Sequence, residues 1–212
     1  ETLPGMQVAR IETIAASPDG ALIAVQGSNA RKQPLRQVWA HAQTQNGCEP
    51  GLHLVDQALA PRPFAFDPKT SDFIVVDVPE LVVVRAADSG PRCTDRARRD
   101  LLDALTEDLN IRSIAFAPDG RRLYYGGGLG RLYFREVMRD ADGRIARVGP
   151  EASLAITPTM TIEHVAGIAG GAIFGDANGR FLRAWVDPPA AAPPTASNAC
   201  SAIRVSASRP PT

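Results

Sequence analysis

The chain has 212 residues, enough to bury the core of one large domain or two small ones without disulfides or metals, and we expect one domain. Lysine plus arginine and aspartate plus glutamate each number 23, so the formal net charge is zero and argues against nucleic-acid or anionic-membrane binding. Hydrophobic residues make up 44% and charged residues 22%, which excludes a disordered chain. No apolar stretch approaches the roughly 18 residues of a membrane-spanning helix.

The first residue and the cysteines say little about the compartment. Residue 1 is glutamate and no apolar leader precedes the first expected strand, which predicts a processed, excised or trimmed chain. The three cysteines, Cys48, Cys93 and Cys200, are too few for a disulfide scaffold, and at least one thiol is unpaired within the chain. The sequence leaves open whether the others pair, and favours the cytoplasm only slightly over the periplasm.

A short apolar motif that ends in a turn recurs along the chain. Residues 14–20, 64–70 and 114–120 contain Pro18, Pro68 and Pro118, so the period is 50 residues (68 − 18 and 118 − 68). Residues 164–170 fill the next position without the proline. We therefore predict four repeats, at about 10–58, 59–108, 109–158 and 159–208.

Each repeat contains four short segments rich in Val, Ile, Phe and Tyr, separated by hairpin signals such as Asp119-Gly120. The expected strands are 12–16, 21–26, 35–41 and 52–56, then 62–66, 72–78, 81–86 and 101–105, then 112–116, 122–126, 131–138 and 144–156, and finally 162–166, 172–175, 180–186 and 202–206. A short helix within 94–105 is an alternative, because its leucines have helical spacing.

A four-stranded antiparallel unit repeated about every 40 to 50 residues is typical of a β-propeller blade. The sequence therefore predicts an all-β fold class, with four blades in one module spanning residues 1–212. An inner strand is covered on both faces, so we expect six residues to be buried: Ile14, Ala15, Phe64, Ala65, Ile114 and Ala115.

The repeat also resembles a known family. Residues 113–125 contain the order apolar, Ser or Ala, Pro-Asp-Gly, strand, and this closely resembles the repeat of WD-repeat-like propellers, including those of the periplasmic Tol system. The resemblance covers nearly the whole chain, but the Gly-His and Trp-Asp pairs of true WD repeats are missing. It implies a fold rather than an activity.

Propellers of this type usually have more than four blades. We therefore expect the ring to be completed by other residues or by another chain. A closed four-bladed ring and a pair of copies are the alternatives.

The longest expected loops connect third and fourth strands, at 42–51, 87–100, 139–143 and 187–199. They share a face with the Pro-Asp-Gly turns, and loops on a rigid scaffold commonly carry function. The densest basic cluster also lies there: Arg92, Arg96, Arg98 and Arg99. Arginine can hold a carboxylate with two hydrogen bonds, so the cluster would suit an acidic protein partner. An ordinary solvated surface is the competing interpretation.

Few residues suggest chemistry. His164 falls in an inner-strand position, as a packed or channel-facing residue or as a channel ligand. Cys48 and His53 lack the second pair that structural zinc needs. Residues 140–143 (Asp-Ala-Asp-Gly) and 176–179 (Asp-Ala-Asn-Gly) resemble the start of a calcium loop but lack its distal glutamate, and residues 126–130 lack the helix that a phosphate loop needs. We expect hairpin turns at all three.

The sequence thus favours a non-catalytic protein-binding, scaffolding or sensor module, with no cofactor, no metal, no nucleic acid and no membrane span. A regulatory domain of a longer chain is a related interpretation. The partner would be another protein, the rest of a larger propeller or a second copy. The alternative is a propeller hydrolase or lactonase-like enzyme with a metal in the central channel, so the enzyme question stays open.

Overall fold

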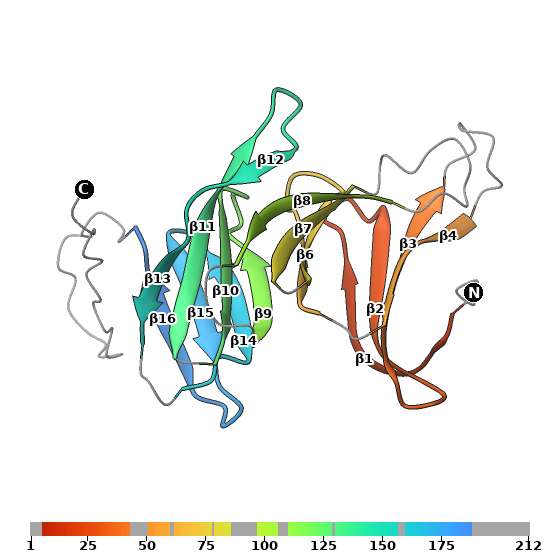
Figure 1. Cartoon of the computed structure of the whole chain (residues 1–212), viewed down its shortest axis with the longest axis horizontal. Coiled ribbons are helices and arrows are strands. Elements are labelled where there is room, and N and C mark those ends of the chain that lie inside the picture. The colour runs from red at the N-terminus through yellow and green to blue at the C-terminus, as the bar shows by residue number, and fades with distance from the viewer. Residues whose placement is uncertain are drawn as a thin grey trace, which may run out of the picture. The chain divides into compact units, whose positions relative to one another are not determined.

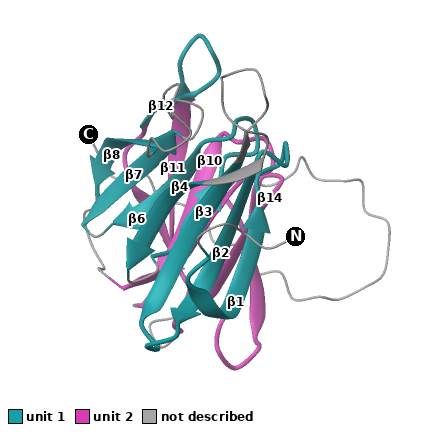
Figure 2. Ribbon diagram, turned by 90° about the vertical axis from the view of Figure 1, so that its right-hand side faces the viewer, with its two compact units in different colours: residues 1–104, 139–147 teal, residues 105–138, 148–212 magenta. Residues whose placement is uncertain are grey.

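The computed structural model describes residues 6–42, 51–59, 62–77, 79–85, 97–105, 110–128, 130–156 and 160–187, with the backbone alone at 41–42 and 51–53. Within these ranges the regular secondary structure consists of β-strands alone, and the strands form four antiparallel sheets (Figure 1). The chain divides into two compact units (Figure 2): unit 1 is residues 1–104 with 139–147, and unit 2 is residues 105–138 with 148–212. Among the described residues no helix is long and apolar enough to cross a membrane.

Unit 1 contains the first two sheets. The first consists of β1 (Val8–Ala16), β2 (Leu22–Asn29), β3 (Pro34–Ala42) and β4 (Gly51–Leu59), and the second of β5 (Phe64–Phe66), β6 (Phe73–Asp77), β7 (Glu80–Arg85) and β8 (Arg98–Ala104). In both, each strand pairs antiparallel with the next strand of the chain, which is the meander of a propeller blade. Because β8 is a strand, the helical alternative is wrong for its residues.

The third sheet contains β9 (Ile111–Phe116), β10 (Arg122–Gly127) and β11 (Arg131–Arg139) in chain order. Two short strands, β12 (Ile145–Val148) and β13 (Ala152–Ala155), replace the single strand predicted at 144–156, and both adjoin β11. Gly149 and Pro150 separate them, and proline has no backbone N–H to continue a ladder.

The fourth sheet contains β14 (His164–Ile168), β15 (Gly171–Gly175) and β16 (Phe181–Trp185), again in chain order. The fourth strand predicted for this blade, residues 202–206, lies outside the described residues. The predicted all-β class and the construction from four successive antiparallel blades are confirmed.

The repeated prolines lie in equivalent turns, as predicted. Pro18, Pro68 and Pro118 each follow the first strand of a blade and precede the second. The residue before each proline donates its backbone N–H across the turn to the carbonyl five residues later: Ser17 to Leu22 at 3.0 Å, Asp67 to Asp72 at 2.9 Å, and Ala117 to Arg122 at 2.8 Å.

Apolar side chains form the core within each unit. In unit 1 one buried cluster joins the first two sheets, and it contains Leu22, Ala24, Val38, Val55, Phe73, Val75, Val84 and Ala97. In unit 2 another joins the third and fourth sheets, and it contains Ala117, Tyr124, Leu132, Leu154, Met160, Ile162, Ala172, Phe174 and Ala184. Strand alternation directs these residues to one face of each sheet.

Burial of the inner strands is confirmed only in part. Ile114 is 7% exposed, whereas Ala15, Phe64, Ala65 and Ala115 are half-buried. The prediction for Ile14 was wrong, because its exposure is 63%. β1 lies at the edge of the first sheet, and residues 9 to 14 are all exposed, so neither face of the strand is covered over that length.

Phe73 should be a sensitive point of the unit 1 core. Its ring is fully buried and contacts Phe66 edge-on with 5.5 Å between ring centroids, so Phe73→Ala should lower the free energy of unfolding by about 3 to 5 kcal/mol. The control is Leu59→Ala, because Leu59 is 68% exposed and should change stability by less than about 0.5 kcal/mol. Urea unfolding measures both; equal losses would contradict the assigned core.

Candidate functional site

The structure describes half of the predicted basic cluster. Arg98 and Arg99 begin β8, and their side chains are 66% and 36% exposed, whereas Arg92 and Arg96 lie outside the described residues. Successive residues of a strand point to opposite faces of its sheet. Arg98 and Arg99 accordingly contact different carboxylates.

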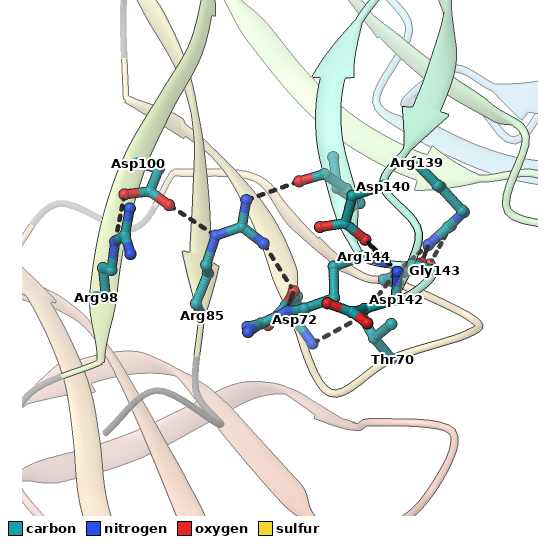
Figure 3. A network of polar contacts seen from close by, with 12 residues as sticks. Thr70, Asp72, Arg85, Arg98, Asp100, Arg139, Asp140, Asp142, Gly143 and Arg144 are labelled. Carbon is teal, nitrogen blue, oxygen red and sulfur yellow. Dashed lines mark hydrogen bonds and ion pairs between the residues drawn. The ribbon is translucent and has the colours of Figure 1, made fainter. Parts of the chain in front are cut away.

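Arg98 lies at the outer end of a series of ion pairs (Figure 3). Its Nε donates to Asp100 at 2.8 Å, and the other oxygen of Asp100 accepts from Nε of Arg85 at 2.6 Å. Arg85 and Arg98 stand directly opposite each other on β7 and β8, so Asp100 neutralises two cations that would otherwise repel. The hydrogen bond from Arg85, assisted by Arg98 and opposed by burial, lowers the pKa of Asp100.

Arg85 connects Asp100 to a buried carboxylate, Asp72. It donates to Asp72 at 3.3 Å and to the carbonyl oxygen of Ile145 at 2.7 Å. Asp72 is 1% exposed and also accepts from Arg144, at 3.0 and 3.2 Å. A buried carboxylate is stable only when it is paired and hydrogen-bonded, and two arginines meet that requirement here.

Arg144 and Ile145 belong to the hairpin that connects β11 to β12, and Asp67 binds this hairpin at a second residue, Arg139. This carboxylate is fully buried and accepts from both terminal nitrogens of Arg139, at 2.6 and 2.7 Å, and from the Thr70 hydroxyl at 2.7 Å. Residues 139–147 are thereby fixed to the second sheet within unit 1. We call this group the arginine–aspartate network: Asp67, Asp72, Asp100, Arg85, Arg98, Arg139 and Arg144.

Arg99 contacts a separate group of charges. It pairs with Asp77 at 3.2 Å and Asp56 at 3.7 Å, and Asp56 pairs with Arg36 at 3.1 Å. Arg36 is fully buried, with its guanidinium carbon 5.5 Å from the Phe64 ring centroid. Burial lowers the pKa of Arg36, and the carboxylate of Asp56 opposes that effect.

The buried members of both groups were not predicted from the sequence. A usable signal was present for Asp67, because the repeat register aligns it with the small residues Ser17 and Ala117. A carboxylate at a position that is small or apolar in other copies indicates a specific partner. Arg36 gives no comparable signal, because its partner Asp56 lies on the next strand rather than nearby in the sequence.

Unit 2 contains another buried arginine, Arg135 on β11 of the third sheet. Arg135 is 1% exposed and donates to the Tyr125 hydroxyl at 3.0 Å, the Gly149 carbonyl at 3.2 Å and Glu151 at 3.3 Å. The Tyr125 hydroxyl itself donates to Glu151. Burial, together with that hydrogen bond, raises the pKa of Tyr125, so its hydroxyl keeps its proton. These contacts connect β10 and β11 to the segment between β12 and β13.

The predicted hairpin turns are confirmed. Oδ1 of Asp140 accepts from the backbone N–H groups of Asp142 and Arg144, and Asp176 makes the same pair of contacts with Asn178 and Arg180. These are Asx turns. The glycine-rich residues 126–130 include the end of β10 at Gly127 and precede β11, which pairs antiparallel with β10, as expected of a hairpin.

The other candidate residues do not come together in the part of the chain that is described. His164 is exposed on β14, Cys48, Cys93 and Cys200 lie outside the described residues, and so does the side chain of His53. Within the described ranges, no three histidine, cysteine, aspartate or glutamate side chains are grouped to hold a metal ion.

A scan of the sequence against protein-family models gave no match, and a search of curated proteins gave no similar protein. The blade architecture is therefore established by the sheets themselves, and the relation to WD-repeat-like propellers depends on the repeated motif alone.

Removal of Arg139 tests the buried part of the arginine–aspartate network. Arg139→Ala leaves the charge of Asp67 buried without its cation and should lower the free energy of unfolding by about 3 kcal/mol. Arg98→Ala removes a cation that is mostly exposed and should cost less than about 1 kcal/mol. Urea unfolding compares them, and a larger loss in Arg98→Ala would contradict the assignment.

Asp100 should make the free energy of unfolding depend on pH in the acidic range. Its pKa in the folded chain is below the ordinary 3.8, so its contribution is present above that pH and is lost as the pH falls through the folded pKa. Asp100→Asn removes the titrating group. The free energy of unfolding should therefore fall more steeply below pH 3.8 in the wild type than in the variant. Parallel curves from urea unfolding across this range would be inconsistent with the Arg85–Asp100 contact.

Proposed function

We propose that the chain is a non-catalytic protein-binding module whose acidic partner docks beside Arg98 and Arg99, on the face that carries the loops between third and fourth strands. The observation that carries this proposal is the support of Arg98: its exposed guanidinium is bound to Asp100, which is tied through Arg85 to the buried Asp72. Arg92 and Arg96, which lie outside the described residues, belong to the same basic cluster of the sequence.

Arg98 and Arg99 are preorganised for binding. A side chain held in place before binding loses less conformational entropy when the partner arrives. Asp100 and Arg85 restrict Arg98, and Asp77 with Asp56 restrict Arg99, while both guanidinium groups remain accessible. Such charges guide approach and orientation more than they add affinity, which suits a docking platform.

The repeated Pro-Asp-Gly motif supports the finer proposal that the blades belong to the WD-repeat-like kind, in which the fold presents loops for contact. The aligned turns of Pro18, Pro68 and Pro118 agree with that kinship. The same module could then serve as a scaffold or as the sensor part of a larger protein.

Charge reversal tests the docking surface. The probe is fluorescein-labelled poly-L-glutamate, and its affinity is measured by fluorescence anisotropy at several salt concentrations. Arg98→Glu combined with Arg99→Glu should weaken binding about tenfold or more and reduce its salt dependence. Arg10→Glu combined with Arg31→Glu is the matched control, because both residues are exposed in unit 1 away from β8.

Arg99→Glu introduces a carboxylate near Asp56 and Asp77, so circular dichroism and urea unfolding must show that the double variant is folded. Arg98→Glu alone, at a side chain that is 66% exposed, separates docking from stability. Equal affinity of the wild type, Arg98→Glu and the control pair would refute the proposed surface.

A further inference from the structure

The fourth sheet has one face that the rest of the described chain leaves open. Strand register places three rows on this face: His164, Gly175 and Phe181; Ala166, Ile173 and Arg183; Ile168, Gly171 and Trp185. Phe181 is 67% exposed and Ile173 is 39% exposed. The opposite face carries Phe174 and Ala184 of the buried unit 2 cluster, so only one face of this sheet is covered.

The central strands of the first sheet, β2 and β3, are covered on both faces. One of its faces contributes Leu22, Ala24 and Val38 to the cluster shared with the second sheet. Its other face buries Val25, Leu35 and Trp39. The central strand of the fourth sheet, β15, has no such second layer among the described residues, because Ile173 is exposed. Contiguous exposed apolar side chains commonly mark an interaction surface.

The outer edge of the fourth sheet is also unpaired within the part of the chain that the structure describes. Among the described residues, β16 pairs with β15 and has no strand on its other side, whereas β3, β7 and β11 each have a strand on both sides (Figure 1). An unpaired strand edge presents backbone donors and acceptors that an extended segment can bind.

The charges on β16 indicate the chemistry of that segment. Strands β14 to β16 contain no carboxylate, and no carboxylate of the described residues pairs with Arg183. Arg183 lies on the ring of Trp185, with its guanidinium carbon 3.6 Å from the ring centroid. It stands between Phe181 and Trp185 on the same face of the strand. A strand that pairs with β16 would therefore lie next to an apolar side chain, a cation and a second apolar side chain, in that order along the strand.

We propose that β16 binds an extended strand of another protein, in which a carboxylate next to Arg183 is flanked, two residues away on each side, by apolar side chains next to Phe181 and Trp185. A second copy bound face to face would bring a surface with a cation and no carboxylate against its like, which the charges disfavour. Residues 202–206 of this chain contain Arg204 and no carboxylate, so they cannot neutralise Arg183 either.

The test uses two labelled peptides and the full chain. Both peptides alternate valine and threonine, and the central residue is glutamate in one and lysine in the other. By fluorescence anisotropy the wild type should bind the glutamate peptide about tenfold more tightly than the lysine peptide. Arg183→Glu should reverse that preference, and Phe181→Ser should weaken both complexes.

Leu59→Ser is the matched control, because Leu59 is an exposed apolar residue on β4 in unit 1. It should leave both affinities unchanged, and so should the Arg98→Glu, Arg99→Glu variant, which separates this surface from the docking face in unit 1. Circular dichroism verifies that each variant is folded.

Three results would overturn the proposal. One is the absence of peptide binding, or binding that ignores the central charge and Arg183. Another is a wild-type dimer, measured by light scattering, that becomes a monomer in Phe181→Ser, because a second copy then covers the face. The third is binding that appears only when Ile203 and Val205 are replaced by proline, because the chain's own residues 202–206 then occupy the edge.

Discussion

A sheet with apolar side chains on both faces needs a covering layer on each face, and this constraint explains most of the packing described above. In the second sheet, Phe73 and Val75 join the shared cluster, while Ile74 and Val76 on the opposite face are equally inaccessible to solvent. Alternation that is apolar on both faces is the mark of a strand that is buried on both sides. The fourth sheet departs from this pattern along one face, where Ile173 and Phe181 are exposed, and this is the reason why we propose it as a surface for contact.

Charges inside the core follow a second requirement. An isolated carboxylate would be expensive to bury, so Asp67 and Asp72 are each surrounded by guanidinium groups from residues distant in the sequence. Such pairs contribute more to a defined geometry than to net stability, because desolvation offsets much of the attraction. Here the geometry is the fixed position of the hairpin 139–147 and, through Arg85 and Asp100, of Arg98.

The sequence predicted the fold because turn chemistry and strand patterning are local. The proline turns, the period and the alternating strands are all set by residues within one blade, and these predictions are confirmed. Ile14 and Arg36 were beyond such reasoning, since exposure of the first and burial of the second depend on what lies beside a strand. For the same reason Arg98 and Arg99 could be located in one basic cluster, while their separate aspartate partners on neighbouring strands could not.

The two proposed surfaces would select partners by different physics. At Arg98 an incoming carboxylate competes with Asp100, which already accepts a hydrogen bond from the same guanidinium, so the gain there is mainly long-range attraction that salt screens. At Arg183 no carboxylate of the described chain competes, and the guanidinium already lies on an aromatic ring next to exposed apolar side chains. Burial of that ring and of Phe181 removes water from the new ion pair and thereby strengthens it. Charge would guide a partner to the first surface, whereas at the second it would determine which strand fits.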